Sequence, residues 1–331
     1  MGLRRASVWD LDAETYSRHE LHTLARAWQE SNCYVDLCVE LLHAAGFEPW
    51  ACLGFTLASD FEGDQFTFFK PPPGDLASLY GVSVYELNLW KPLLDHALLH
   101  LERGAILLAE ADAYYLPDTT GTDYRHAHTK TTIGLERVDL DTRTLGYFHN
   151  AGYFELSGAD FDGLFQIEPK VPETHLPPYV ELFRSVGNAA LSERELIACS
   201  LSLARKHLNA RPRTAQSPIR RYKEQFAADV DWLLSRDLPT YHLYAFSVLR
   251  QLGANFEYAS LYLEWLGRHG QSGLEPAAQA FNAISETAKA MILKLARMVN
   301  SKRAGDLGAM LDSMDTEWER GMLALDARLA P

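Results

Sequence analysis

The stretch Ser31–Leu37, "SNCYVDL", places a cysteine where a polar pair gives way to an apolar helical stripe. The sequences on either side, "LARAWQE" and "CVELLHAAGFEP", have helical patterns, and we predict helices over residues 15–29 and 33–45. Cys33 then lies in the first turn of the second helix. A cysteine there is either a small buried hydrophobe or a thiolate nucleophile stabilised by the helix N-terminus, and the rest of the chain must decide between the two.

Length and composition restrict the class of protein. The chain has 331 residues, of which 47% are hydrophobic, enough for two domains with cores of their own. A net charge of -13 argues against binding to nucleic acid or to an anionic membrane. The four cysteines show no CxxC spacing, and no apolar run resembles a signal peptide or a membrane span. We therefore expect a reduced cytoplasmic protein without a metal or cofactor of its own.

The first half of the chain has an α+β pattern. Runs rich in β-branched and aromatic residues predict strands at residues 51–58, 65–70, 105–116, 129–138 and 145–156. Residues 72–81 and 84–104 have helical patterns between them. After the proline-rich residues 167–180, apolar residues recur at three- and four-residue spacing. We predict an α+β domain over residues 1–170 and an all-α helical bundle over residues 171–331.

A cysteine nucleophile needs a histidine base and a group that orients the imidazole. His126 and His128 precede the predicted strand at 129–138, and His128 stands at its threshold. The next predicted strand carries His149 and Asn150 in its middle, and either could lie beside His128. The order of Cys33, His128 and Asn150, with the cysteine on an early helix, is that of papain-like folds, with His149 as the alternative third member.

Other polar residues near these positions suggest supporting roles. Papain-like enzymes stabilise the oxyanion with the N–H of the nucleophile and an upstream side-chain amide, for which Gln29 and Asn32 are both available. Asp112, in a strand-like run, needs a partner and is expected to anchor the following loop or a substrate amine. Asp118 and Asp123 in that loop are turn formers first and substrate contacts second.

Four segments resemble the bacterial domain-of-unknown-function family 1839. They are "NCYVDLCVELLHAAGFEP", "FTLASDFEGDQFTFFKPPPGDLASLYGV", "ADAYYLPDTTGTDYRHAHTKTTI" and "YFHNAGYFEL". The resemblance covers most of residues 15–165. More distantly, "EADAYYLP" followed by a His-led strand is similar to the papain-like N-terminal domain of butirosin-type acyltransferases, which move an aminoacyl group from a carrier-protein thioester to an amine. This resemblance implies Cys33 as the acyl-accepting thiol, His128 as base and Asn150 as orienter.

A basic segment interrupts the acidic second half. It contains Arg205, Lys206, Arg211, Arg213, Arg220, Arg221 and Lys223. This segment is either a solvated surface or a docking site for an acidic carrier protein and the phosphate of its phosphopantetheine, with Arg220 and Arg221 as candidate contacts.

Three functions are compatible with the sequence. The favoured one is an acyltransferase that passes an aminoacyl or related group from a carrier protein through a Cys33 thioester to a small amine acceptor. The second is a cysteine amidase or peptidase with the same triad and water as acceptor. The third is a non-catalytic carrier-protein adaptor in which Cys33 is structural.

Overall fold

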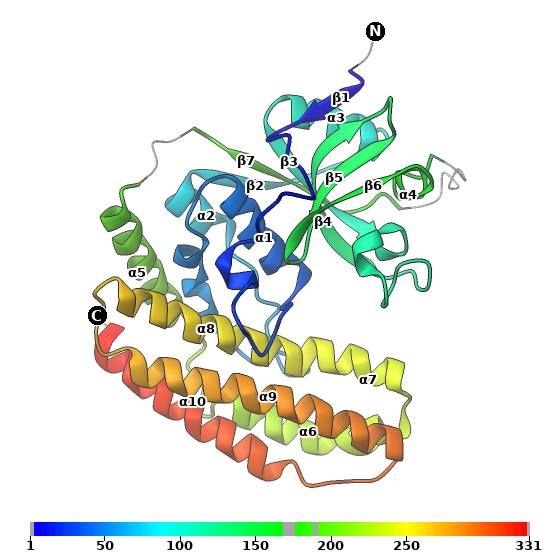
Figure 1. Cartoon of the computed structure of the whole chain (residues 1–331). Helices are drawn as coiled ribbons and strands as arrows, with labels where there is room; N and C mark the ends of the chain where they lie inside the picture. The colour runs from blue at the N-terminus through cyan, green and yellow to red at the C-terminus, as the bar shows by residue number, and fades with distance from the viewer. Residues whose placement is uncertain (1–2, 168–175, 188–190, 330–331) are drawn as a thin grey trace. The chain divides into compact units, whose positions relative to one another are not determined.

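The computed structural model describes residues 3–167, 176–187 and 191–329 (Figure 1). The chain forms two compact units, each made of three segments. The first unit comprises Met1–Leu24, Asn32–Pro49 and Pro72–Ala190. The second unit comprises Ala25–Ser31, Trp50–Pro71 and Leu191–Pro331.

The first unit is built on a seven-stranded antiparallel sheet in the order β2-β7-β3-β4-β5-β6, with β1 paired to β4. The strands are β1 (Arg5–Ser7), β2 (Val82–Leu87), β3 (Ala105–Asp112), β4 (Lys130–Asp139), β5 (Thr144–His149), β6 (Gly152–Ser157) and β7 (Val180–Ser185). β-Branched and aromatic residues recur in these strands and suit a pleated surface that is buried on at least one face.

Helices cover the sheet of the first unit. The α-helices are α1 (Cys33–Ala44), α2 (Pro73–Tyr80), α3 (Leu93–Glu102) and α4 (Ala159–Leu164), and the short 3₁₀ turns are η1 (Glu20–His22), η3 (Ala113–Tyr115) and η4 (Pro117–Thr119). Helix α1 packs against β4, β5 and β6. Leu37 and Leu41 come so close to β4 that a Cβ on Gly134 would lie 3.3 and 3.5 Å from their methyl groups. Gly134 therefore marks the sheet face that α1 covers.

The second unit is helical. Its elements are most of the 3₁₀ segment η2 (Pro49–Ala58), α5 (Glu193–Ala210), α6 (Pro218–Ser235), α7 (Leu238–Ala245), the π-helical turn η5 (Phe246–Arg250), α8 (Gln251–Arg268), α9 (Glu275–Ser301) and α10 (Gly308–Leu329). The segment Ala25–Ser31 is held in this unit by a buried ion pair in which Arg26 Nε lies 2.9 Å from Glu257 Oε2. Within the described residues, no helix is long and apolar enough to cross a membrane.

The mixed α+β character and the helical second half are confirmed. The boundary between them differs from the predicted one at residue 170, because β7 lies beyond it and pairs with both β2 and β3. Part of the proline-rich passage, residues 168–175, lies outside the described residues.

Four predicted elements were wrong. The strand predicted at 65–70 contains only an isolated bridge from Phe66 to Phe61. The helix predicted over residues 15–29 contains only η1, because this segment divides between the two units. The strand predicted at 51–58 is the 3₁₀ segment η2, since a short apolar run does not distinguish a buried strand from a buried helix. The helix predicted over 84–104 begins only at Leu93, after β2 and Pro92.

The predicted strand at 145–156 is a hairpin. His149 pairs with Gly152 at the ends of β5 and β6, and Asn150 stands in the turn with a positive φ of 45°. Asparagine tolerates this left-handed conformation better than most residues, which suits a tight turn. Asn150 is therefore not in the middle of a strand.

Candidate functional site

Cys33 is the first residue of α1, and its side chain is half-buried. The helix begins there because Asn32 caps it: Asn32 Oδ1 accepts hydrogen bonds from the backbone N–H groups of Tyr34 and Val35, at 3.1 and 2.9 Å. At this position the backbone dipoles of a twelve-residue helix favour a negative charge. Cys33 therefore lies in the first turn of a helix, the position predicted from the sequence.

The two proposed oxyanion residues have different surroundings. The side-chain oxygen of Asn32 is occupied as the helix cap, as described above. Gln29 belongs to the segment held in the second unit, is exposed, and donates from Nε2 to the backbone carbonyl of Arg26 at 3.2 Å. The backbone N–H of Cys33 lies in the first turn of α1, where helix N–H groups have no intrahelical acceptor.

His128 forms a hydrogen-bonded pair with Asp112, its Nδ1 lying 2.6 Å from Asp112 Oδ2. Asp112 ends β3, opposite Lys130 at the start of β4, so the sheet register brings the carboxylate to the imidazole. The ring also stacks on Tyr114, with centroids 4.5 Å apart and an interplanar angle of 15°. The carboxylate therefore fixes Nδ1 as the protonated nitrogen and leaves Nε2 for proton exchange.

Asp112 was expected to anchor the following loop or a substrate amine. Its carboxylate contacts His128, the last residue of that loop, and accepts from the backbone N–H of Tyr114 at 3.1 Å, so it holds the loop and also lies against the candidate base. A carboxylate at the end of one strand and a histidine just before the next was the available signal. It could be used only once the register of β3 and β4 was known.

His149 belongs to a different network. It is buried, with Nδ1 2.6 Å from Asp118 Oδ2 and Nε2 2.8 Å from the Thr131 hydroxyl oxygen. Its register partner is Ile133, the neighbour of Gly134. Since successive strand residues face opposite sides, His149 lies on the face away from α1. Asp118, which also accepts from the Tyr147 hydroxyl, is used to hold His149.

The remaining candidates are not joined to His128. In residues 3–167, 176–187 and 191–329, no hydrogen bond links His128 to Cys33, His149 or Asn150. Asp123 acts in the turn, where its backbone carbonyl accepts from the N–H groups of His126 and Ala127 at 2.9 and 3.0 Å.

The basic segment 205–223 is partly neutralised within the second unit. Arg221 pairs with Asp60 and donates to the Phe61 carbonyl at 2.6 Å, while Arg220 Nε lies 3.1 Å from Asp315 Oδ2. Lys223 and Arg211 pair with Asp312 and Asp326. Three of its cations, Arg205, Lys206 and Arg213, are exposed and have no ion pair among the described residues.

A buried ionic network between η1 and α1 was not predicted from the sequence. The fully buried imidazole of His22 contacts Glu40 through Nδ1 and lies 3.4 Å from Asp36 Oδ1 through Nε2. Burial alone would lower the pKa of His22, but hydrogen bonds to Asp36 and Glu40 outweigh it and raise the pKa. Two acidic residues four apart on an otherwise apolar helix were the signal, because buried carboxylates need partners.

The pKa of Glu40 shifts in the opposite direction. Its burial alone would raise the pKa, but hydrogen bonds from His22 and from the Tyr16 hydroxyl lower it. The network therefore joins η1 to α1 through a buried ion pair. In the part of the chain that the structure describes, no group of three or more His, Cys, Asp and Glu side chains is placed to hold a metal ion.

Both halves of the chain match models of one protein family. Residues 17–185 match the DUF1839 N-terminal domain, and residues 193–327 match the DUF1839 C-terminal domain. The junction between the matches follows β7 and precedes α5. No curated protein matches the chain.

Proposed function

The chain belongs to the DUF1839 family, and we propose that it is a cysteine-dependent acyltransferase. In this proposal Cys33 is the nucleophile, and His128, oriented by Asp112, is the general base and acid. The acyl donor is an aminoacyl or related thioester on a carrier protein, and the acceptor is a small amine. We further propose that the first unit is a variant of the papain-like fold, with the helix of the nucleophile packed on an antiparallel sheet that carries the base.

The observation that carries the proposal is the 2.6 Å contact between His128 and Asp112. A carboxylate that holds one imidazole nitrogen stabilises the imidazolium formed when the other nitrogen takes a proton. The exposed imidazole can exchange that proton with a bound substrate. Cys33 suits the same chemistry by its place in the first turn of α1, where the backbone dipoles favour a negative charge.

The reaction has two half-steps. In the first, His128 Nε2 takes the proton of the Cys33 thiol, and the sulfur attacks the thioester carbonyl. The carrier thiol leaves with the proton from His128, and the acyl group remains on Cys33 as a new thioester. In the second, His128 takes a proton from the acceptor amine as nitrogen attacks this thioester, and it returns the proton to the Cys33 sulfur as the amide forms.

Hydrolysis is the second candidate. The partial neutralisation of the basic segment 205–223 reduces the charge available for an acidic carrier protein and so favours a small-molecule amide or thioester. A hydrolase uses the same two half-steps with water in place of the amine. The two candidates differ in the fate of the acyl-enzyme and not in its formation.

Intact-mass spectrometry after mixing the protein with aminoacylated carrier protein tests both candidates. We expect an acyl adduct on the wild-type chain and on Cys199→Ser, which removes another half-buried thiol, and none on Cys33→Ser. Added amines should discharge the adduct as amides if the protein is a transferase. Discharge to free acid only would identify a hydrolase. An equal adduct on Cys33→Ser, or none on any protein, would contradict the proposal.

A further inference from the structure

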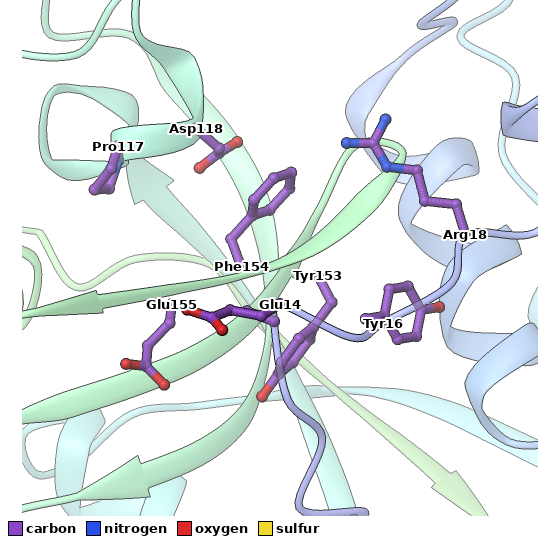
Figure 2. Close-up of a pocket in the computed structure, with 9 residues that line it drawn as sticks. Glu14, Tyr16, Arg18, Pro117, Asp118, Tyr153, Phe154 and Glu155 are labelled. Carbon is purple, nitrogen blue, oxygen red and sulfur yellow. The ribbon is translucent and has the colours of Figure 1, made fainter.

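A pocket of about 460 Å³ opens beside β6 in the first unit (Figure 2). Its lining comes from the segment before η1, from η4 and from β6, and comprises Ala13, Glu14, Tyr16, Arg18, Pro117, Asp118, Tyr153, Phe154 and Glu155. The volume falls in the range of small-molecule sites, which is roughly 300–1,000 Å³. The proposed reaction assigns no role to this pocket.

Aromatic rings supply its apolar surface. Tyr16 donates its hydroxyl to Glu40 at 2.6 Å, and Tyr153 donates to Glu136 at 2.7 Å. Burial, together with these carboxylates, raises the pKa of both phenols, so they remain neutral. Both hydroxyl groups are therefore occupied and Tyr153 is buried, so the half-buried Phe154 offers ring surface to a ligand.

Two of the charged groups in the lining are already used. Asp118 accepts from His149 and Tyr147, and Glu155 pairs with Arg137. In contrast, the side chains of Glu14 and Arg18 have no hydrogen bond or ion pair among the residues that the structure describes. The pocket therefore holds one free carboxylate and one free guanidinium.

These two charges lie apart. In Figure 2 the carboxylate of Glu14 and the guanidinium of Arg18 are on opposite sides of the Phe154 side chain. Gly152 leaves space for this arrangement, since a Cβ there would lie 2.9 Å from Phe154 Cζ and 3.3 Å from Arg18 Nε. The guanidinium and the phenyl ring thus share the space that a side chain at position 152 would fill.

We propose that this pocket binds a free amino acid. Its ammonium group would pair with Glu14, its carboxylate with Arg18, and its side chain would pack on Phe154. A guanidinium suits a carboxylate because it donates two parallel N–H bonds. A ligand with both charges satisfies both free groups at once, whereas an amine or an acid alone leaves one of them unpaired. The site is separate from the acyl-transfer proposal and does not depend on it.

Binding of the twenty L-amino acids to the full-length Cys33→Ser protein, by thermal shift and then calorimetry, tests the proposal without chemistry at the cysteine. We expect at least one to bind with a Kd of about 1 mM or lower. Arg18→Gln and Glu14→Gln should each weaken binding by about 10-fold or more. Arg103→Gln and Glu102→Gln, which make the same changes at exposed positions outside the pocket, should leave the affinity unchanged.

Analogues of the best ligand separate the two ends of the pocket. The amine that lacks the carboxylate should bind more weakly than the amino acid and should be insensitive to Arg18→Gln. The acid that lacks the ammonium should likewise be insensitive to Glu14→Gln. No binding of any amino acid at about 10 mM, or an affinity in both pocket variants equal to that of the Cys33→Ser parent, would overturn the proposal. Such a result would leave formation of the Cys33 adduct untouched, so the two proposals fail separately.

Discussion

Asp112 and His128 are joined across the end of the sheet where β3 finishes and β4 begins, with Asp112 Oδ2 2.6 Å from His128 Nδ1. The His128 side chain is largely exposed, with 69% of its surface accessible to solvent. An exposed ion pair contributes at most about 1 kcal/mol to stability. Its orientation of the imidazole therefore matters more for reactivity than for folding.

Asp112→Asn tests this role. We expect the rate of acyl transfer to Cys33 to fall by about 100-fold or more, because the imidazole loses the carboxylate that orients it and stabilises its protonated form. The free energy of unfolding should change by less than about 1 kcal/mol. The matched control is Lys130→Gln, which removes the neighbouring exposed ion pair with Glu110 and leaves the imidazole contact intact. Equal rates in the two variants would remove Asp112 from the mechanism.

His22→Gln tests the buried network. Removing one partner of a buried ion pair leaves the other uncompensated, so we expect a loss of about 3–5 kcal/mol near pH 5.5, measured by urea denaturation. The pKa of His22 is raised in the folded protein. Its contribution to the free energy of unfolding is therefore complete below pH 6.5, the ordinary pKa of histidine, and is lost as pH rises through the folded-state pKa. The pKa of Glu40 is lowered in the folded protein. Its contribution to the free energy of unfolding is therefore present above pH 4.5, the ordinary pKa of glutamate, and is lost as pH falls through the folded-state pKa.

The difference between the wild type and His22→Gln should therefore be largest between pH 4.5 and 6.5 and smaller at about pH 9. A difference that stays constant across this range would mean that His22 stabilises the fold by packing alone. Glu40→Gln should show a comparable maximum, since it breaks the same pair from the other side.

Gly253→Ala tests packing in the second unit. A Cβ at this position in α8 would lie 2.2 Å from Trp28 Cζ2 and 3.0 Å from Ala288 Cβ. We expect a loss of about 1–3 kcal/mol from overpacking, despite the higher helix propensity of alanine. Gly267→Ala, in the same helix with nothing within 4 Å of the new Cβ, should be neutral or stabilise by up to about 1 kcal/mol. Thermal unfolding of the wild type and of both variants measures these changes in stability.

Reversal of Arg205, Lys206 and Arg213 to Glu tests carrier-protein docking on the basic segment 205–223. We expect slower association, measured by stopped-flow fluorescence, and a weaker salt dependence than in the wild type, because exposed charges act mainly on the encounter rate. Reversing Arg221 is a poorer test, since a new carboxylate would face Asp60 and destabilise the fold. Unchanged association and salt dependence in the triple variant would show that the segment is a solvated surface.

Local patterns predicted α1, its start at Cys33, the strand that follows His128 and the helices of the second half. They did not predict β7, whose six residues become a strand by pairing with β2 and β3. Nor did they show that residues 25–31 leave the first unit, which depends on distant partners such as Glu257. The periodicity of apolar residues shows which face of a helix or strand is buried. It does not show which distant element packs against that face.

The sequence by itself determined the chemical inventory: a cysteine at the start of a helix, a histidine at the threshold of a strand, and an acidic chain with one basic segment. Only the tertiary structure decided how these groups are paired. Strand register brought Asp112 to His128 and turned His149 to the opposite face from α1, because a shift of one residue reverses the direction of every side chain on a strand. Long-range ion pairs likewise neutralised Arg220 and Arg221, since a charge pattern along the chain does not reveal which carboxylate folds against it.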